Sequence, residues 1–313
     1  MLQTEGLTKA YDTTVAVQDL NINVRAGEIY GFLGPNGAGK TTTIRLLLGL
    51  LQPTAGSVFL FGQRNTNDMV ALKRRIGVVA EEPLSMTRMT GWEFIRFFAD
   101  LNAVPQPEAR MEALFQALDL WDARHALVGA YSRGMRQKLS LLRALVHGPE
   151  LLILDEPVSG LDPYGILQVR QLVEEHRQNG GAVLISSHIL SEIERSADRV
   201  GILHQGRLLV EDTVEGIRQR LGRARVLKLG LVMVPSTLPD ALRQIHNVEG
   251  VEVRDSQITV HIIGQNDIRP EIFRTVVAQG GVLLEMTGEE MSLEEAFVTI
   301  THQNVAQLAG ATA

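Results

Sequence analysis

The chain lacks cysteine altogether, which excludes disulfide bonds and thiol chemistry and fits a cytosolic protein. It also lacks an apolar run approaching the roughly 20 residues that a membrane-spanning helix needs. Residues 1–5 show neither the basic nor the apolar stretch of a secretory signal. We therefore expect a protein that is not itself integral to a membrane, although it can dock on one.

Positive charge is scarce as well. The 30 Lys and Arg residues are outnumbered by 36 Asp and Glu residues, which gives a net charge of −6. Proteins that grip nucleic acid neutralise phosphates with a basic surface, so this balance argues against a nucleic-acid partner. The 45% of hydrophobic residues is ordinary for a globular protein, and 313 residues suffice for one large or two medium domains.

The most informative pattern that is present is a complete phosphate loop, G-x-x-x-x-G-K-[ST]. An apolar strand is expected just before it at 28–33, and a helix is expected after it at 42–48, which is the context that the motif requires. Backbone N–H groups of such a loop surround phosphate oxygens, and the helix N-terminus adds partial positive charge. Lys40 can reach the β and γ phosphates, and the Thr41 hydroxyl can ligate Mg²⁺. The expected phosphate-binding residues are Gly34, Pro35, Asn36, Gly37, Ala38, Gly39, Lys40, Thr41 and Thr42.

A second chemical motif follows a buried-type strand at Leu151–Leu154. Asp155 is expected to hold Mg²⁺ opposite Thr41, directly or through water. Glu156 is the candidate general base that polarises the attacking water. His188 follows the next apolar strand and could reach a γ-phosphate, because strand C-termini form the ligand crevice of a doubly wound sheet.

Strands and helices alternate through the first two thirds of the chain. Apolar strands at 151–154 and 182–186 flank a helix expected over 163–178, which favours a parallel sheet covered on both faces. Shorter strands are expected within 1–30 and 56–62. Between about residues 90 and 137 the pattern is helical, with Leu114, Ala117 and Leu118 as an apolar core stripe.

The character of the sequence changes near residues 221–223. The order of expected elements beyond that point is β-α-β-β-α-β, which is typical of a ferredoxin-like split unit. A capping box at Ser292–Glu295 predicts one more helix, and the tail is expected to fray. We therefore divide the chain into domains at 1–222 and 223–301 and a tail at 302–313. The elements expected in the second domain are strand 226–233, helix 239–247, strands 251–255 and 257–263, helix 268–279 and strand 281–286.

The motifs over residues 1–220 together resemble the ATP-binding subunit of ABC transporters. Tyr131–Met135 stands where that family has its signature, and Ser159–Asp162 resembles its D-loop. Tyr11 stands where the family stacks an aromatic ring on adenine, and Glu81 where it places the Q-loop glutamine that faces the metal. The resemblance implies an α/β P-loop NTPase fold with antiparallel β and helical subdomains, joined here to a small α+β domain.

Two departures from the family pattern are informative. The signature has Arg133 and Met135 where Gly and Gln are commonest, and this form resembles the exporters related to bacitracin-resistance ATPases. Ser132 and Gly134, which would contact the γ-phosphate, are retained. Glu81 in place of glutamine keeps an oxygen ligand and adds charge near the metal.

The resemblance also implies partners. Such subunits bind ATP and Mg²⁺ and form head-to-tail dimers, in which the phosphate loop of one copy faces Ser132 and Gly134 of the other. Asp162 of the D-loop would belong to the same nucleotide site. The dimer would power a separate integral-membrane permease, with the ATPase lying peripherally on the inner face of the cytoplasmic membrane. We expect export of a substrate driven by ATP hydrolysis.

Three other functions compete with this interpretation. A non-transport ABC ATPase acting on ribosomes or DNA would usually carry two ATPase units, a long coiled coil or zinc motifs, none of which is evident here. Residues 223–301 could instead be a ligand-binding regulator, which is compatible with transport. An α/β kinase that shares only the phosphate loop is disfavoured by the Ser132–Gly134, Asp155–Glu156 and His188 motifs together.

Overall fold

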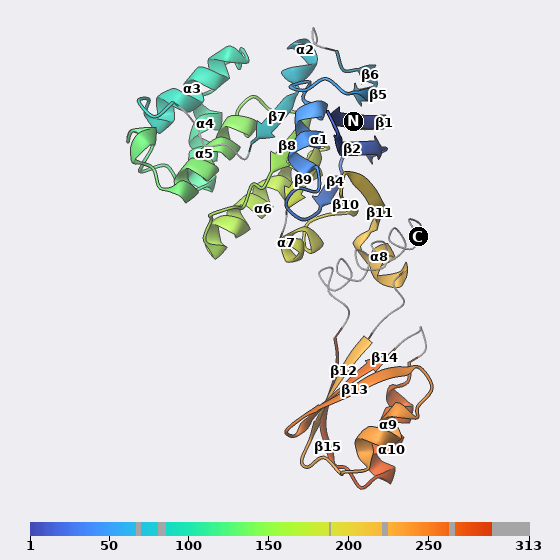
Figure 1. The fold of residues 1–313 in the computed structure, drawn as a ribbon. Coiled ribbons are helices and arrows are strands. Elements are labelled where there is room, and N and C mark those ends of the chain that lie inside the picture. Colours follow the sequence, from blue (N-terminus) through green and yellow to red (C-terminus); the bar gives the residue numbers. More distant parts are fainter. Residues whose placement is uncertain (67–69, 81–85, 188, 221–224, 263–266, 290–313) are drawn as a thin grey trace. The chain divides into compact units, whose positions relative to one another are not determined.

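The computed structural model describes residues 1–66, 70–80, 86–187, 189–220, 225–262 and 267–289 (Figure 1). The chain divides into two compact units, Met1–Thr213 and Val214–Ala313. The expected domain boundary at residue 222 and the expected last helix and tail, 292–313, lie outside the described residues.

A six-stranded sheet with the order β11-β10-β4-β9-β8-β7 forms the centre of the first unit. From β10 to β7 neighbouring strands are parallel, and β11 joins one edge in antiparallel orientation. Every residue of β4, β8 and β9 is buried, because other elements cover both faces of these strands, and this explains their continuous apolar sequences. The predicted parallel sheet is confirmed. Its strands are β4 (Ile29–Leu33), β7 (Ile76–Val79), β8 (Leu151–Asp155), β9 (Ala182–Ser187), β10 (Arg199–His204) and β11 (Arg207–Thr213).

A smaller antiparallel sheet lies in the same unit, with the order β2-β1-β5-β6 and β3 paired to β1. Its buried residues join the core cluster that also contains side chains of β4, β8 and β9. The N-terminal strands are therefore an integral part of the first unit. Their bounds are β1 (Leu2–Tyr11), β2 (Thr14–Leu20), β3 (Asn23–Val24), β5 (Ala55–Leu60) and β6 (Gln63–Arg64).

Helices connect the strands of the central sheet. Helix α1 contacts β8, and α6 and α7 contact β9. Helix α6 spans the predicted range and begins with Pro163, whose missing N–H costs nothing at that position. Outside the helical region, the described helices of the first unit are α1 (Lys40–Leu47), α2 (Val70–Lys73), α6 (Pro163–Gln178) and α7 (Leu190–Glu194), and α8 (Val214–Arg220) begins the second unit.

The predicted helical region contains α3 (Gly91–Leu101), α4 (Glu108–Ala117), a 3₁₀ turn (Val128–Ala130) and α5 (Arg133–Leu145). The buried stripe of α4 consists of Met111 and Phe115 and continues to Leu118. The expected stripe was therefore partly wrong, because Leu114 is half-buried and Ala117 is exposed. The large side chains at positions 111 and 115 set the face that packs.

The second unit contains a four-stranded antiparallel sheet with the order β13-β14-β12-β15. Helices α9 and α10 contact each other, α9 contacts β13 and α10 contacts β15. The unit has a separate core, built from residues of β12, β13 and β14 and of both helices. The predicted β-α-β-β-α-β order is confirmed, with shifts of up to three residues in most bounds and four at the end of α9. The elements are β12 (Arg225–Leu231), α9 (Leu238–Arg243), β13 (Val248–Arg254), β14 (Gln257–Ile262), α10 (Arg269–Ala278) and β15 (Leu283–Glu289).

Among the described residues, none of the helices combines the length and the hydropathy that crossing a membrane would require.

Candidate active site

The phosphate loop connects the buried end of β4 to the first residue of α1. Gly39 is the residue before α1 and has a φ of 107°, a backbone conformation that favours glycine. A Cβ atom at Gly39 would lie 2.5 Å from the main-chain oxygen of Ala16, so any side chain would force the β2 strand away. The loop is thus held tightly against the antiparallel sheet, with its N–H groups at the start of α1.

A pocket of about 280 Å³ opens at this loop. The loop and the start of α1 provide most of its wall, and the end of β8 provides two carboxylates. The start of a helix offers unpaired N–H groups and partial positive charge, so this pocket suits an anion such as a phosphate chain. Its lining residues are Ala16, Pro35, Asn36, Gly37, Gly39, Lys40, Thr41, Thr42, Asp155 and Glu156.

Lys40 is folded over the loop, with only 7% of its side chain exposed. Its Nζ donates hydrogen bonds to the main-chain oxygen of Gly34 at 2.5 Å and to that of Pro35 at 3.3 Å. The same Nζ lies 3.9 Å from Oε1 of Glu156. The ammonium is therefore fixed beside the pocket, between the loop and a carboxylate, where a phosphate oxygen would meet it.

Thr41 and Asp155 meet across the pocket. The Thr41 hydroxyl donates to Oδ2 of Asp155 at 3.2 Å, and the Ser186 hydroxyl donates to Oδ1 at 2.5 Å. Asp155 is almost fully buried, so these two bonds fix its carboxylate. Hydroxyl and carboxylate oxygens are the ligands that Mg²⁺ prefers, and this ion usually keeps water and phosphate oxygens as its other ligands. The donor set therefore fits Mg²⁺.

Glu156 follows β8 directly in a strained conformation. Its φ of 50° lies in the left-handed region that residues with side chains rarely adopt. Its N–H donates to the hydroxyl of Ser186 at 3.1 Å. On its other side, the amide of Gln137 donates to the main-chain oxygens of Glu156 at 3.2 Å and Pro157 at 3.0 Å.

Comparison with known proteins identifies the family. The sequence profile of the ABC transporter family matches residues 17–159. The chain is 39% identical over 301 residues to the bacitracin transport ATP-binding protein BcrA of Bacillus licheniformis, covering 96% of this chain and 97% of that one. It is 36% identical over 306 residues to the daunorubicin/doxorubicin resistance ATP-binding protein DrrA of Streptomyces peucetius, covering 96% and 92%.

A solved structure of an ATP-binding subunit of an ABC transporter superposes with a TM-score of 0.68 and 30% identity, covering 71% of this chain and 93% of that one. The chain belongs to the ATP-binding subunits of ABC transporters. The predicted family, P-loop fold and nucleotide-binding activity are therefore confirmed. The protein is an ATPase of the exporter type, and these relatives give no support to a role on ribosomes or DNA.

Three motif residues of this ABC ATPase begin helices or lie in their first turn. Ser132 precedes α5, and its hydroxyl accepts a hydrogen bond from the N–H of Met135 at 3.1 Å, with Gly134 in the same turn. Asp162 precedes α6, and its carboxylate accepts from the N–H of Gly165 at 2.7 Å. Burial raises the pKa of the neighbouring Tyr131, whose phenol donates to the main-chain oxygen of Ala123.

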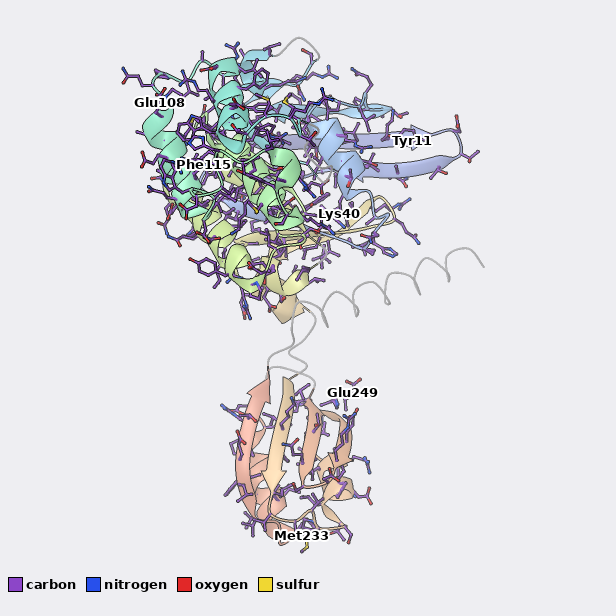
Figure 2. All side chains as sticks on the ribbon, turned by 90° about the vertical axis from the view of Figure 1, so that its left-hand side faces the viewer. Tyr11, Lys40, Glu108, Phe115, Met233 and Glu249 are labelled. Carbon is purple, nitrogen blue, oxygen red and sulfur yellow. The ribbon has the colours of Figure 1, made fainter. Side chains whose placement is uncertain are left out.

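Tyr11 ends β1 and is 45% exposed, with the Nζ of Lys9 5.0 Å from the centre of its ring. Tyr11 is followed by the turn between β1 and β2, and Figure 2 shows it on this hairpin. In the described part of the chain, Tyr11, Ser132, Gly134 and Asp162 do not line the phosphate pocket. Glu81 and His188 lie outside the described residues.

Sequence reasoning missed three residues of the site. Ala16 lines the pocket, Ser186 binds both Asp155 and Glu156, and Gln137 binds the main chain at Glu156. A signal existed for Ser186, because it lies near the end of an apolar strand, and the C-termini of such strands form the ligand crevice of a doubly wound sheet. For Ala16 and Gln137 there was none, since both reach the site through tertiary packing.

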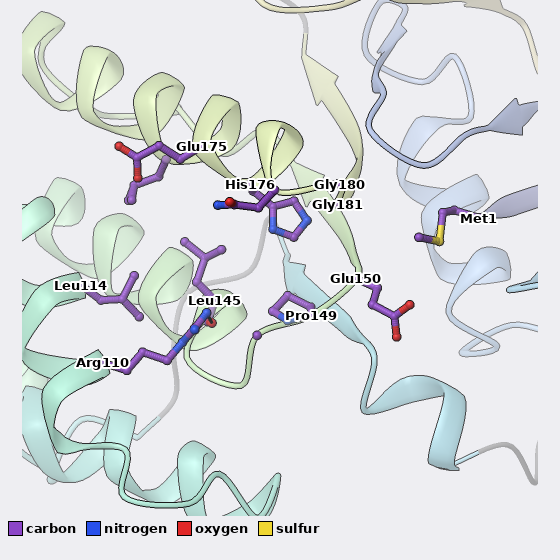
Figure 3. A pocket seen from close by; sticks show the side chains of 13 residues that line it. Met1, Arg110, Leu114, Leu145, Pro149, Glu150, Glu175, His176, Gly180 and Gly181 are labelled. Atoms are coloured by element: carbon purple, nitrogen blue, oxygen red, sulfur yellow. Dashed lines mark hydrogen bonds between the residues drawn. The ribbon is translucent and has the colours of Figure 1, made fainter.

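A larger pocket, of about 610 Å³, lies at the N-terminal ends of β8 and β9 (Figure 3). The phosphate loop lies at the opposite, C-terminal end of the parallel strands. Arg110 from α4 and His176 from α6 both line it. Burial lowers the pKa of the His176 imidazole, helped by the positive charge of Arg110, so this histidine is neutral at pH 7. Glu150 and Glu175 line the same space. Charges of both signs are thus present, and they single out no ligand class.

Proposed function

We propose that this subunit binds ATP with Mg²⁺ in the phosphate pocket and hydrolyses it to drive a separate membrane permease. The observation that carries this proposal is the convergence of Lys40, Thr41, Asp155 and Glu156 on one pocket at the start of α1. A cation, a metal-binding pair and a carboxylate base are the parts that ATP hydrolysis requires.

Each of these residues has a distinct role in the proposal. The ammonium of Lys40 attracts the β and γ phosphates and neutralises charge that develops on them. Thr41 and Asp155 would hold Mg²⁺, which would neutralise further phosphate charge when bound. Glu156 accepts the proton of the attacking water, because its carboxylate lines the phosphate pocket and lies beside Lys40, where the γ-phosphate would bind. His188 is proposed to assist at the γ-phosphate, and Glu81 to face the metal.

The proposed working form is a head-to-tail dimer with ATP between the two copies. The start of α5, with Ser132 and Gly134, would contact the γ-phosphate bound to the partner copy, because a helix N-terminus attracts anions. Asp162 would lie at the same interface, and Tyr11 would stack on adenine. This arrangement explains why Ser132, Gly134 and Asp162 do not line the phosphate pocket of their own chain. Loss of the γ-phosphate would then release the dimer, which converts hydrolysis into movement.

The transporter as a whole is proposed to export its substrate across the cytoplasmic membrane, with the ATPase on the inner face. Relatives named for bacitracin transport and for daunorubicin and doxorubicin resistance support an exporter of compounds of this kind. We propose 1–222 as the ATPase domain and 223–301 as an accessory domain that stabilises or modulates the dimer.

A complementation experiment tests the shared site. Ser132→Arg places a bulky cation where the partner's phosphate would lie, whereas Lys40→Ala removes a contact to the subunit's own phosphate. Each variant alone should lose ATPase activity, and Ser132→Arg should keep its ATP affinity. Mixed in equal amounts, the two should form about half heterodimers, each with one intact site, and recover about a quarter of the parent activity.

The alternative arrangement gives a different result. If Ser132 served the nucleotide of its own chain, every site in the mixture would carry a lesion and no activity would return. Strong loss of ATP affinity in Ser132→Arg alone would lead to the same conclusion. Co-purification of a multi-span membrane protein with the parent tests the permease partner.

A further inference from the structure

One side of helix α5 holds the segment that follows β8 at two points. Gln137 donates to the main-chain oxygens of Glu156 and Pro157, and Arg133 donates to the hydroxyl of Ser159 at 3.0 Å. Arg133 and Gln137 are four residues apart, so both project from the same face of the helix. The segment 156–159 is therefore attached to this one face at three of its four residues.

The attachment matters because the backbone of Glu156 is strained. A residue with a side chain adopts a φ of 50° only where its surroundings hold it there. Ser186 fixes the N–H of Glu156, and Gln137 fixes its carbonyl oxygen. The main chain is thus held on both sides of the Cα atom, and this determines the direction of the carboxylate, 3.9 Å from Lys40.

The same helix begins at the signature segment. Ser132 caps α5, and Gln137 lies in its second turn, so a rigid helix connects the two. Under the proposed function, Ser132 and Gly134 contact ATP bound to the partner copy. We propose that Gln137 is a positioning residue through which that contact orients Glu156, the base of its own chain. This inference rests on the proposed function, and it adds a route by which each bound ATP controls hydrolysis of the other.

The first test removes the amide donor and keeps the shape of the side chain. The side chains of Gln137→Met and Gln137→Glu both lack the amide N–H group, so neither can donate to the main-chain oxygens of Glu156 and Pro157. ATP affinity should stay within about twofold, while turnover should fall roughly 10- to 100-fold, the cost of a misplaced catalytic group. Gln171→Met on α6 is the matched control, because the Gln171 amide donates to the carboxylate of Glu175 on the exposed surface of the same helix, and its turnover should not change.

The second test separates positioning of the base from a general defect of α5. Heterodimers with one Glu156→Gln protomer have a single active base and provide the reference activity. Pairing Glu156→Gln with Gln137→Met puts the Gln137 lesion beside the active base, so activity should fall 10- to 100-fold below the reference. Pairing the double variant Gln137→Met/Glu156→Gln with the parent puts the lesion beside the inactive base, so activity should stay within about twofold of the reference.

Each other outcome overturns a specific claim. Equal loss in both heterodimers would show that Gln137 supports α5 as a whole and does not position Glu156. Turnover of Gln137→Met and Gln137→Glu at the parent rate would overturn the inference and leave the proposed function in place. A folded parent without Mg²⁺-dependent ATPase activity would instead overturn the proposed function and the inference with it.

Discussion

Replacement of Glu156 by glutamine is the sharpest single test of the proposed chemistry. The substitution keeps the shape of the side chain and removes its charge and its capacity to accept a proton. The hydrogen bonds that residue 156 makes with Ser186 and Gln137 use its main-chain N–H as donor and its main-chain oxygen as acceptor, so they persist in the variant. We therefore expect a folded protein with an intact phosphate loop.

The magnitude follows from two opposing effects. Loss of a general base costs about 10²- to 10⁴-fold in rate, or roughly 3–5 kcal/mol of barrier. The substitution also removes an attraction between Glu156 and Lys40, whose charged atoms are 3.9 Å apart and whose side chains are 12% and 7% exposed. The gross attraction at such a distance is about 4 kcal/mol near a protein surface, and the desolvation of both groups offsets much of it. Lys40 is then more available to phosphate, so ATP affinity should not fall.

The assay compares phosphate release at saturating Mg²⁺ and ATP with ATP affinity measured at equilibrium. Because the variant binds ATP and hydrolyses it very slowly, size-exclusion chromatography with ATP should show a dimer that does not dissociate. Glu150→Gln is a suitable control, since Glu150 precedes the same strand at its other end and pairs with the exposed Arg75. A monomeric Glu156→Gln protein that turns over within about threefold of the parent would refute Glu156 as the base.

Two further predictions concern regions outside the phosphate pocket. Ending the chain after residue 222 should leave ATP affinity intact and change dimer affinity, stability or coupling to the permease, because the two units have separate cores; loss of nucleotide binding in a folded truncated protein would contradict this. Burial lowers the pKa of His147 from its usual 6.5, so the unfolded chain binds the extra proton and stability should fall as the pH drops below that value. Denaturant midpoints at pH 7 and pH 5 should therefore differ less in His147→Gln than in the parent, and an unchanged difference would exclude His147 as a source of acid sensitivity.

The sequence alone determined the features that depend on local order along the chain. The phosphate loop needs glycines, a lysine and a threonine at fixed spacing, so Gly34–Thr41 could be recognised from the letters. Apolar strands and the helix over Pro163–Gln178 were predicted because burial on both faces and helix capping leave local patterns. The order of elements in the second unit was predicted for the same reason. Strand register and side-chain packing leave weaker patterns in the sequence. Several predicted helix and strand bounds therefore differ from the observed ones, and Ala117 was wrongly placed in the core.

Only the tertiary structure decided which distant residues share the site. Ser186 and Gln137 meet at Glu156 because β9 pairs with β8 and α5 runs beside the end of β8. The left-handed backbone of Glu156 is likewise invisible in the sequence, since glutamate has no preference for it. These features arise from contacts between residues 19 to 31 positions apart, and no local pattern encodes such contacts. The reacting groups could thus be predicted from the sequence, whereas the orientation of their side chains in the site depends on the fold.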